Sequence, residues 1–258
     1  MSGSTARSYL IDDYLGNAYR QRRPELAFRA RTKEEWLTWR SLFQAKLIEL
    51  MGGFPTKRCP LQPELMRRDD CGDYFREKIV FESEPGVSVP AYVLVPKGAK
   101  PPLPGLLCLH GHGNGKDDVV GIAPDPKRRD YIRALNYDYA VQFVRRGYVT
   151  ITMDARGFGE RRTGYEFEGR DGCNVVFLKC LLLGLNPLTL NVWDAMRCVD
   201  YLGTRPEVDS ERIGCVGLSY GGTLTLYTAA LDQRIKVATI SCYLNTFKAY
   251  ALDLNNTC

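Results

Sequence analysis

One serine of this chain lies between two glycines, in the pattern Gly217-x-Ser219-x-Gly221, and its surroundings limit the fold more than any other feature. Residues 213–218 are a short apolar run with charged flanks, which predicts a buried strand. Residues 223–231 predict a buried helix. A strand that turns into a helix within a few residues needs glycines around the turn, because larger side chains would not fit there. Such a turn exposes the side chain at its apex. We therefore interpret Ser219 as a candidate nucleophile; the alternative is an ordinary serine in a tight turn.

The other apolar runs alternate between strand and helix character. Residues 74–83 and 90–95 have strand character on either side of a Pro-Gly turn, which predicts a hairpin. Later segments predict strands at 106–109, 148–153 and 237–242, and helices at 131–146 and 192–202. A hairpin followed by strand–helix units predicts an α/β fold, with a mostly parallel sheet and helices on both faces.

The pattern divides the chain into an N-terminal helical extension, residues 1–70, and an α/β core, residues 71–258. In the extension, Thr32 and Glu35 fit a capping box at the start of a helix. A stripe of large apolar residues follows at helical spacing, and we expect it to pack rather than to bind a ligand. The stripe consists of Trp36, Trp39, Phe43, Leu47 and Leu50. In the core, the insertion at 160–190 is predicted to be irregular, and its apolar part is too short to span a membrane and predicts a cap or a pocket wall.

Charge and cysteine content argue against several classes of protein. The net charge of +5 is modest, and no long basic tract indicates a nucleic-acid partner. Neither a secretory pattern nor a membrane-spanning apolar stretch is recognisable in the sequence, so we expect no membrane association. Nine cysteines without a Cys-x-x-Cys pair fit a reducing compartment. We therefore expect a cytoplasmic protein, and a homo-oligomer is compatible with the sequence.

A glycine-rich loop follows the predicted strand 106–109, with the sequence His110-Gly-His-Gly113. Acyl transfer by a serine needs a base, a group that orients the base, and N–H donors for the oxyanion. The loop can turn backbone N–H groups toward Ser219, and the N–H that follows the nucleophile is a second donor. We predict an oxyanion hole formed by the N–H groups of His112 and Tyr220, with Gly111 and Gly113 shaping the loop.

Four segments together carry a family resemblance: Leu-His-Gly-His-Gly at 109–113, Asp-Ala-Arg-Gly-Phe-Gly at 154–159, Arg-Pro-Glu-Val-Asp at 205–209, and Gly-Leu-Ser-Tyr-Gly-Gly at 217–222. They resemble the α/β-hydrolase superfamily, and within it the dienelactone-hydrolase-like and acetyl-xylan-esterase-like bacterial esterases. The resemblance covers residues 70–250. It implies the α/β-hydrolase fold and hydrolysis of small-molecule carboxylic esters at Ser219, without cofactor or metal. It also implies that Arg156 ties loops together near the site and that Asp154 is not the acid of the triad.

The chain departs from this family in one respect. Its enzymes present serine, acid and histidine in that order, but no histidine follows Ser219, and both histidines of the chain lie in the glycine-rich loop. Asp232 and Asp253 do follow Ser219, and Asp253 is the better candidate for an acid placed one strand early. We therefore expect residues 1–258 to be the N-terminal part of a hydrolase. Its acid and base would come from a remainder that is truncated, cleaved off or supplied as a separate chain.

Three other functions were weighed against hydrolysis. The loop around Lys116 resembles a phosphate-binding loop, but its glycine spacing is wrong and two aspartates follow the lysine. Two histidines that lie two residues apart, without a matching carboxylate or cysteine set, make a metal site a weak interpretation. A non-catalytic interaction protein that keeps the hydrolase fold and has lost its base is the alternative that the sequence leaves open.

Overall fold

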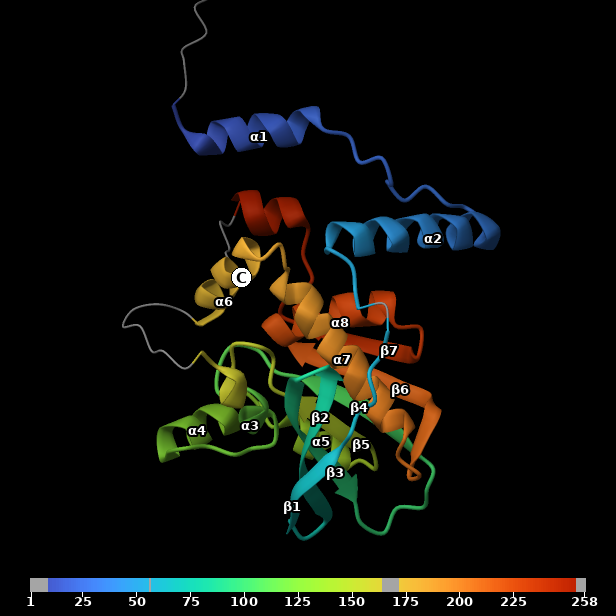
Figure 1. Ribbon diagram of the computed structural model, residues 1–258, viewed down its shortest axis with the longest axis vertical. Helices are drawn as coiled ribbons and strands as arrows, with labels where there is room; N and C mark the ends of the chain where they lie inside the picture. The colour runs from blue at the N-terminus through green and yellow to red at the C-terminus, as the bar shows by residue number, and fades with distance from the viewer. Residues whose placement is uncertain (1–8, 56, 164–171, 254–258) are drawn as a thin grey trace, which may run out of the picture. The chain divides into compact units, whose positions relative to one another are not determined.

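The computed structural model describes residues 9–55, 57–163 and 172–253 (Figure 1). The chain separates into two compact units, residues 1–46 with 245–258 and residues 47–244. The division into residues 1–70 and 71–258 stays a prediction. Residues 64–70 nevertheless form a strand, β1 (Glu64–Asp70), that pairs with the next strand of the second unit. Most side chains of β1 are exposed, so its sequence lacks the alternating apolar pattern from which a strand can be predicted.

The first unit is helical within its described residues. It holds α1 (Ile11–Gln21), most of α2 (Lys33–Leu50) and a π-helical turn, η2 (Lys248–Asp253). The predicted capping box is confirmed: the Glu35 N–H donates to Thr32 Oγ1 at 3.2 Å, and the Thr32 N–H donates to Glu35 Oε2 at 3.4 Å. The predicted stripe packs only in part. Trp39 stacks on Phe43 with ring centroids 4.9 Å apart, but Trp36 remains 38% exposed.

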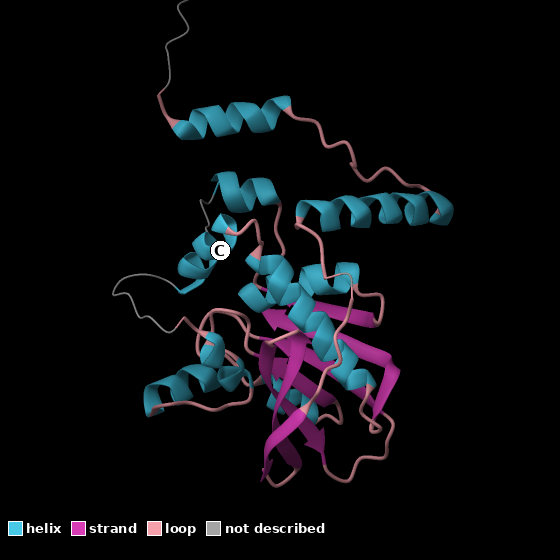
Figure 2. Ribbon diagram, viewed as in Figure 1, coloured by secondary structure: helices cyan, strands magenta, loops and turns pink. Residues whose placement is uncertain are grey.

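The second unit is built on a seven-stranded sheet, shown in magenta in Figure 2. Its strands lie in the order β1-β2-β3-β5-β4-β6-β7. The bounds after β1 are β2 Tyr74–Glu84, β3 Val87–Pro96, β4 Leu103–Leu109, β5 Val149–Met153, β6 Val208–Leu218 and β7 Ile235–Ser241. Strands β1, β2, β3 and β5 pair antiparallel, whereas β5, β4, β6 and β7 pair parallel. The sheet is therefore mixed, because the predicted hairpin adds antiparallel strands beside the parallel part.

Helices cover both faces of this sheet, as predicted. Alternate residues of β4 point to opposite sides: Leu107 and Leu109 join one core cluster, and Leu106 and Cys108 join the other. Helices α7 (Pro187–Gly203) and α8 (Tyr220–Leu231) contribute to the first cluster. Helices α3 (Lys116–Val119) and α5 (Tyr139–Val144) contribute to the second. The site-bearing turn between β6 and α8 is thus held by a core on each side of the sheet.

Two helical segments differ from the prediction. The predicted helix 131–146 is two helices, α4 (Pro126–Ala134) and α5, because Asn136 adopts a φ of +50° between them. The segment 160–190, expected to be irregular, contains α6 (Gly172–Leu182), while residues 164–171 lie outside the described part. Leu178, Leu181 and Leu182 on α6 are more than half exposed. The assignment of this segment as a cap or pocket wall stays a prediction.

A helix that crosses a bilayer must be long and almost entirely apolar. Taken singly, none of the described helices meets both conditions. Residues 173–182 and 187–203 satisfy the length and composition requirement only as a pair, and a bend of 104° separates them. The second member of the pair is α7, whose side chains are mostly buried in the protein core.

Candidate active site

The candidate nucleophile lies at the apex of a turn between a strand and a helix, as predicted. Strand β6 ends at Leu218, α8 begins at Tyr220, and Ser219 alone makes the turn. Ser219 has φ +56° and ψ −117°, a backbone conformation that is costly for a residue with a Cβ. Its N–H donates to the Ser241 carbonyl at the end of β7 (2.9 Å), and its carbonyl accepts from the Thr223 N–H (3.0 Å). These bonds hold the strained turn, and the serine side chain is exposed above it.

The two glycines of the motif are required by close backbone contacts. A Cβ on Gly217 would overlap the Gly221 carbonyl. A Cβ on Gly221 would overlap the Leu109 carbonyl and would lie 2.8 Å from the His110 carbonyl. Neither contact can be relieved by moving a flexible side chain, because both partners are backbone. The glycines thus let α8 start directly against the end of β4.

The glycine-rich loop lies directly beside Ser219, as predicted. Parallel pairing places Leu109 of β4 opposite Gly217 of β6, so the residues after both strands emerge at the same sheet edge. A Cβ on Gly111 would lie 2.7 Å from the Leu218 carbonyl and 3.2 Å from the Ser219 Cβ. Gly111 therefore allows the loop to approach the serine. Gly113 lies against Asp118 and Arg128 instead, with a φ of +153°.

The Gly111 N–H has a partner that the sequence did not reveal. It donates to the Tyr137 hydroxyl at 2.8 Å. Burial raises the pKa of Tyr137 to about 12, so the phenol stays neutral at physiological pH. This bond holds the backbone of the loop in place beside Ser219. Because this bond uses the Gly111 N–H, the N–H of the next residue, His112, stays the predicted oxyanion donor of the loop.

His110 is fixed within the protein core by both ring nitrogens. Its Nε2 accepts the Ala155 N–H at 3.0 Å, so the proton is on Nδ1, which lies 2.7 Å from the Gly111 carbonyl. The side chain is 1% exposed, and its burial lowers the pKa of the imidazole. A neutral ring with its acceptor nitrogen already occupied is poorly placed to take a proton from Ser219. We assign His110 to holding the loop rather than to proton transfer.

This burial predicts a pH dependence of stability. In the unfolded chain His110 titrates near its ordinary value of 6.5, whereas in the folded protein its pKa is lower. Below pH 6.5 the unfolded state therefore binds more protons than the folded state. As the pH falls through this range, the free energy of unfolding should fall by at most about 1.4 kcal/mol per pH unit. Urea unfolding between pH 7 and pH 5 measures this slope. His110→Asn should remove it, and an unchanged slope in that variant would contradict the assignment.

His112 lies among aromatic rings at the same sheet edge. Its ring centroid is 5.6 Å from that of Tyr220 and 5.4 Å from that of Phe158, which follows β5. Its Nε2 lies 3.4 Å from the Cys173 thiol at the start of α6. The structure thus brings together four predicted site residues, namely Ser219, Gly111, His112 and Tyr220.

A buried ion pair supports the loop from below. Asp154, 0% exposed, accepts from the Lys116 backbone N–H at 2.8 Å and from Lys116 Nζ at 2.7 Å. It also accepts from the Glu160 N–H at 3.0 Å. Burial by itself would lower the pKa of Lys116, but the charge of Asp154 and the hydrogen bonds to Asp154 and Glu160 outweigh it and raise the pKa. Asp154 is thus fully engaged in structure, in agreement with its exclusion as the triad acid.

Arg156 ties three elements together, as the family resemblance implied. Its guanidinium donates to both carboxylate oxygens of Asp194 in α7, each at 2.9 Å, and to Glu84 at the end of β2 at 2.6 Å. Burial would raise the pKa of Asp194, but hydrogen bonds from Arg156 and the charge of Arg161 lower it. The turn after β5 is therefore anchored to α7 by an ionised, buried carboxylate.

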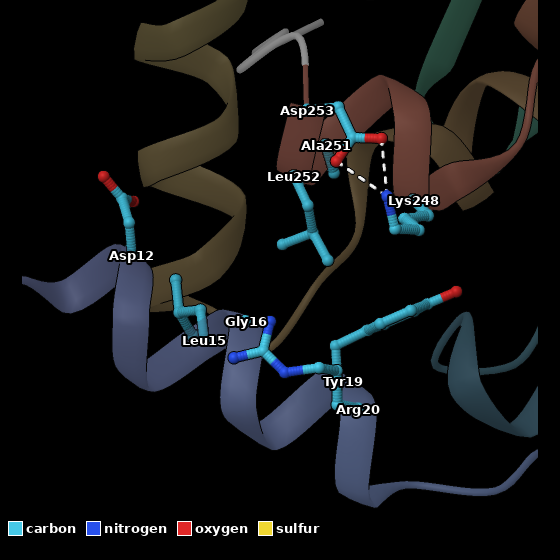
Figure 3. A pocket seen from close by; sticks show the side chains of 9 residues that line it. All are labelled: Asp12, Leu15, Gly16, Tyr19, Arg20, Lys248, Ala251, Leu252 and Asp253. Carbon is cyan, nitrogen blue, oxygen red and sulfur yellow. Dashed lines mark hydrogen bonds and ion pairs between the residues drawn. The ribbon is translucent and has the colours of Figure 1, made fainter.

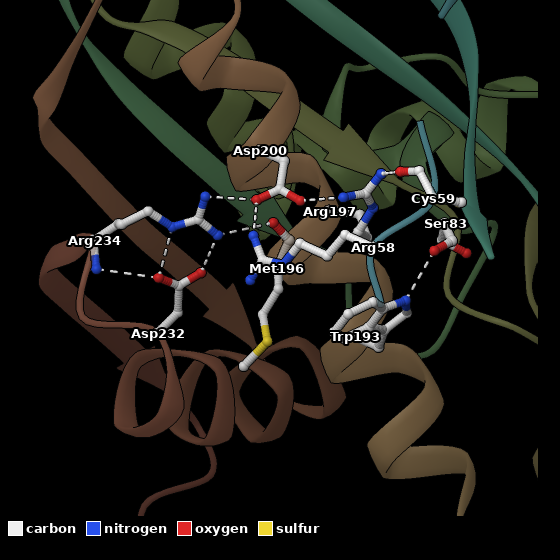
Figure 4. Close-up of polar contacts among 9 residues, drawn as sticks. All are labelled: Arg58, Cys59, Ser83, Trp193, Met196, Arg197, Asp200, Asp232 and Arg234. Atoms are coloured by element: carbon white, nitrogen blue, oxygen red, sulfur yellow. Dashed lines mark hydrogen bonds and ion pairs between the residues drawn. The ribbon is translucent and has the colours of Figure 1, made fainter. Parts of the chain in front are cut away.

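Asp232 is unsuited to the role of triad acid. It lies just beyond the C-terminus of α8, and a helix of 12 residues rises about 18 Å from the Ser219 end. Its carboxylate is bound by Arg234, through Nε at 2.9 Å and Nη2 at 2.6 Å. Arg234 also reaches Asp200, which in turn binds Arg58 and Arg197 (Figure 4). This network joins the C-terminal ends of α7 and α8 to the segment before β1.

Asp253, the other candidate acid, belongs to the first unit. Both of its carboxylate oxygens accept from Lys248 Nζ, at 2.9 and 2.7 Å. It lines a small pocket between α1 and η2, together with residues such as Leu15 and Tyr19 (Figure 3). The pocket contains none of the predicted nucleophile or oxyanion residues. Asp253 as triad acid stays a prediction.

The chain is similar to a family of known proteins and to several solved structures. A family model described as the Abhydrolase family matches residues 9–250. A Bacillus subtilis (strain 168) protein named "Putative hydrolase YtaP" is 30% identical over 201 residues, which are 76% of this chain and 62% of that protein. Chains of similar fold include a Bacteroides fragilis protein described as a "putative acetyl xylan esterase", with a TM-score of 0.78 at 23% identity. That match covers 92% of this chain and 62% of the other.

A second solved structure has the same kind of fold. The acetyl xylan esterase from Paenibacillus sp. R4 has a TM-score of 0.53 at 23% identity, over 88% of this chain and 61% of that chain. At such identities the structural likeness establishes the fold alone. The chain spans less than two thirds of the length of YtaP and of both esterase structures.

Proposed function

Because the chain belongs to the α/β-hydrolase family, whose model matches residues 9–250, we propose that it is a serine hydrolase of carboxylic esters. The observation that carries the proposal is the exposed Ser219, held at a positive φ between β6 and α8 and bordered by the Gly111 loop. A serine in this setting can attack a carbonyl carbon and form an acyl-enzyme.

The proposed reaction assigns a role to each neighbouring group. Ser219 Oγ gives its proton to a base and bonds to the ester carbonyl carbon, whose oxygen becomes an oxyanion. The backbone N–H groups of Tyr220 and His112 stabilise this oxyanion. Tyr220 directly follows the nucleophile, and His112 directly follows Gly111, the glycine that lies against Ser219. Collapse of the tetrahedral intermediate breaks the bond to the alcohol, which leaves with the proton held by the base. Water then gives a proton to the base and attacks the acyl-enzyme, and the acid is released as Ser219 Oγ regains its proton. No step requires a cofactor.

We infer that the general base and its orienting acid come from residues outside 1–258. His110 is fixed by Ala155 and Gly111, and Asp232 is held by Arg234 at the far end of α8. The last parallel strand supports the same inference: in β7, residues 236–239 are exposed, and Val237 is 68% exposed. Parallel strands are normally covered on both faces. Further strands beside β7 would cover it and would bring an acid and a histidine to the Ser219 edge.

This inference predicts that esterase activity depends on a further segment. Residues 1–258 alone should be insoluble or inactive toward p-nitrophenyl acetate, chosen because structural neighbours are named for acetyl esters. Adding a C-terminal segment of roughly 80–120 residues, fused or as a separate chain, should restore turnover. Steady-state assays of both forms decide the matter. Full, Ser219-dependent turnover by a soluble monomer of residues 1–258 would contradict the proposal and would make His112 the base.

The alternative function is that of an interaction protein which keeps the fold without catalysis. The engagement of His110 in structure is the observation that favours it. Against it stands the strained conformation of Ser219, because a serine without a chemical role gains nothing from a costly backbone. Covalent labelling of the serine separates the two functions.

A further inference from the structure

A buried amide connects the two sides of the candidate site. Asn191 lies in the second turn of α7 and is 1% exposed. Its Nδ2 donates to the Tyr220 hydroxyl at 2.9 Å, and its Oδ1 accepts the Arg156 N–H at 2.7 Å. The orientation of the amide is fixed, because only its oxygen can accept from a backbone N–H. Both polar ends of Asn191 are therefore used, each by a different site loop.

Tyr220 connects the Asn191 amide to the candidate nucleophile. Its backbone follows Ser219, and its ring stacks on Phe158 with centroids 5.6 Å apart and planes 29° apart. The same ring lies against the ring of His112, with centroids 5.6 Å apart. A shift of the Tyr220 ring would therefore move both residues whose N–H groups are the proposed oxyanion donors.

Helix α7 is a rigid base for this connection. Arg156 is tied to it at two points: its backbone N–H binds Asn191, and its guanidinium binds Asp194, three residues further along the helix. Asp194 is fully buried, and Arg161 also donates to it at 2.7 Å. Asn191 thus holds the Tyr220 hydroxyl at a fixed position relative to α7, and Tyr220 directly follows Ser219.

We propose that Asn191 is a positioning residue for the oxyanion hole, acting through the Tyr220 hydroxyl. The inference rests on the proposed serine hydrolase function, and Asn191 itself touches neither nucleophile nor substrate in this account. It sets where the Tyr220 and His112 backbones lie when negative charge develops on the ester oxygen. Its effect should therefore appear in stabilisation of the transition state and not in binding of the ester.

The test uses the complete esterase and the variant Asn191→Leu. We expect kcat for p-nitrophenyl acetate to fall by about 10- to 100-fold with KM nearly unchanged. The inhibition constant of phenylboronic acid, which forms a tetrahedral adduct with the serine, should rise by a similar factor. Tyr220→Phe should give a loss of the same kind, and the double variant should be no worse than Asn191→Leu. Asn191→Asp should recover much of the activity, since one oxygen keeps the bond from the Arg156 N–H and the other can accept from the Tyr220 hydroxyl, which then turns to donate.

Thr189→Val is the matched control. Thr189 is a buried residue of the same helix, and its hydroxyl donates to the Met51 carbonyl, away from the site. It should lower the melting temperature without changing kcat. Equal losses of kcat in Thr189→Val and Asn191→Leu would overturn the proposal, as would a folded Asn191→Leu enzyme within threefold of wild type. If Asn191→Leu does not fold, a Tyr220→Phe enzyme within threefold of wild type overturns it. A wild-type protein without any esterase turnover would instead overturn the proposed function, and this inference with it.

Discussion

Replacing Ser219 by Ala is expected to lower kcat/KM for p-nitrophenyl acetate in the complete protein by at least about 10³-fold. In the proposed mechanism the removed Oγ is the atom that forms the acyl-enzyme, and alanine offers no atom that can replace it. The fold should survive, because the hydrogen bonds at the turn are made by the backbone of residue 219. Alanine also keeps the Cβ that the strained conformation already accommodates.

A second serine of the same strand provides the control for this experiment. Ser210 is exposed near the start of β6, at the opposite end of the strand from Ser219. Ser210→Ala should keep the wild-type rate. Retention of the wild-type rate by Ser219→Ala would show that the nucleophile is elsewhere.

Gly111→Val is expected to lower kcat by about 10²- to 10³-fold, the loss typical of a disabled oxyanion hole. A Cβ at this position lies 2.7 Å from the Leu218 carbonyl and 2.9 Å from the Tyr137 hydroxyl. The loop must move away from Ser219, because the Leu218 carbonyl belongs to the strand and cannot yield. His112→Ala should retain activity within about tenfold, since its backbone N–H survives the substitution. Steady-state kinetics of the two variants measure this asymmetry.

The control for Gly111→Val is a glycine with open space around it. Nothing lies within 4 Å of a Cβ built on Gly203, at the end of α7. Gly203→Val should have nearly wild-type kcat. A loss in His112→Ala as large as that in Ser219→Ala would mean that the imidazole takes part in the chemistry, and the backbone account of the loop would be wrong.

The strand–turn–helix around Ser219 could be predicted because its determinants are local. Two glycines, an apolar run before them and an apolar helix after them lie within one short stretch, and each has a single structural meaning. The neighbouring glycine-rich loop was predictable for a related reason: both loops follow parallel strands, and such strand ends share a sheet edge. The capping box of α2 is local in the same way.

Apart from Arg156, which the family resemblance implied, the residues that support the site could not be predicted, because their partners are distant in sequence. Tyr137 is 26 residues from Gly111, and Asn191 is 29 residues from Tyr220. Each is an ordinary polar residue, and only the packing of the helices on the sheet reveals its role. The sequence argues against a phosphate-binding loop at Lys116, but it does not reveal that the ammonium is buried against Asp154. Charge pattern alone does not distinguish a buried ion pair from an anion site.

The break between α4 and α5 was missed for a different reason. Most residues of 131–146 are compatible with a helix, although Asn136 and Asp138 are weak helix formers, and the left-handed conformation of Asn136 separates the two helices. Asparagine tolerates that conformation but does not require it. Tertiary contacts decide such a position: the turn after α4 places Tyr137 under the Gly111 loop.

The most direct measurement of the central claim is covalent labelling with a fluorophosphonate. The complete protein is treated with the reagent, digested, and the modified residue is identified by mass spectrometry. The account predicts one label per chain, on Ser219, with none in Ser219→Ala. Modification of a different residue, or no labelling of a folded and complete protein, would contradict Ser219 as an activated nucleophile.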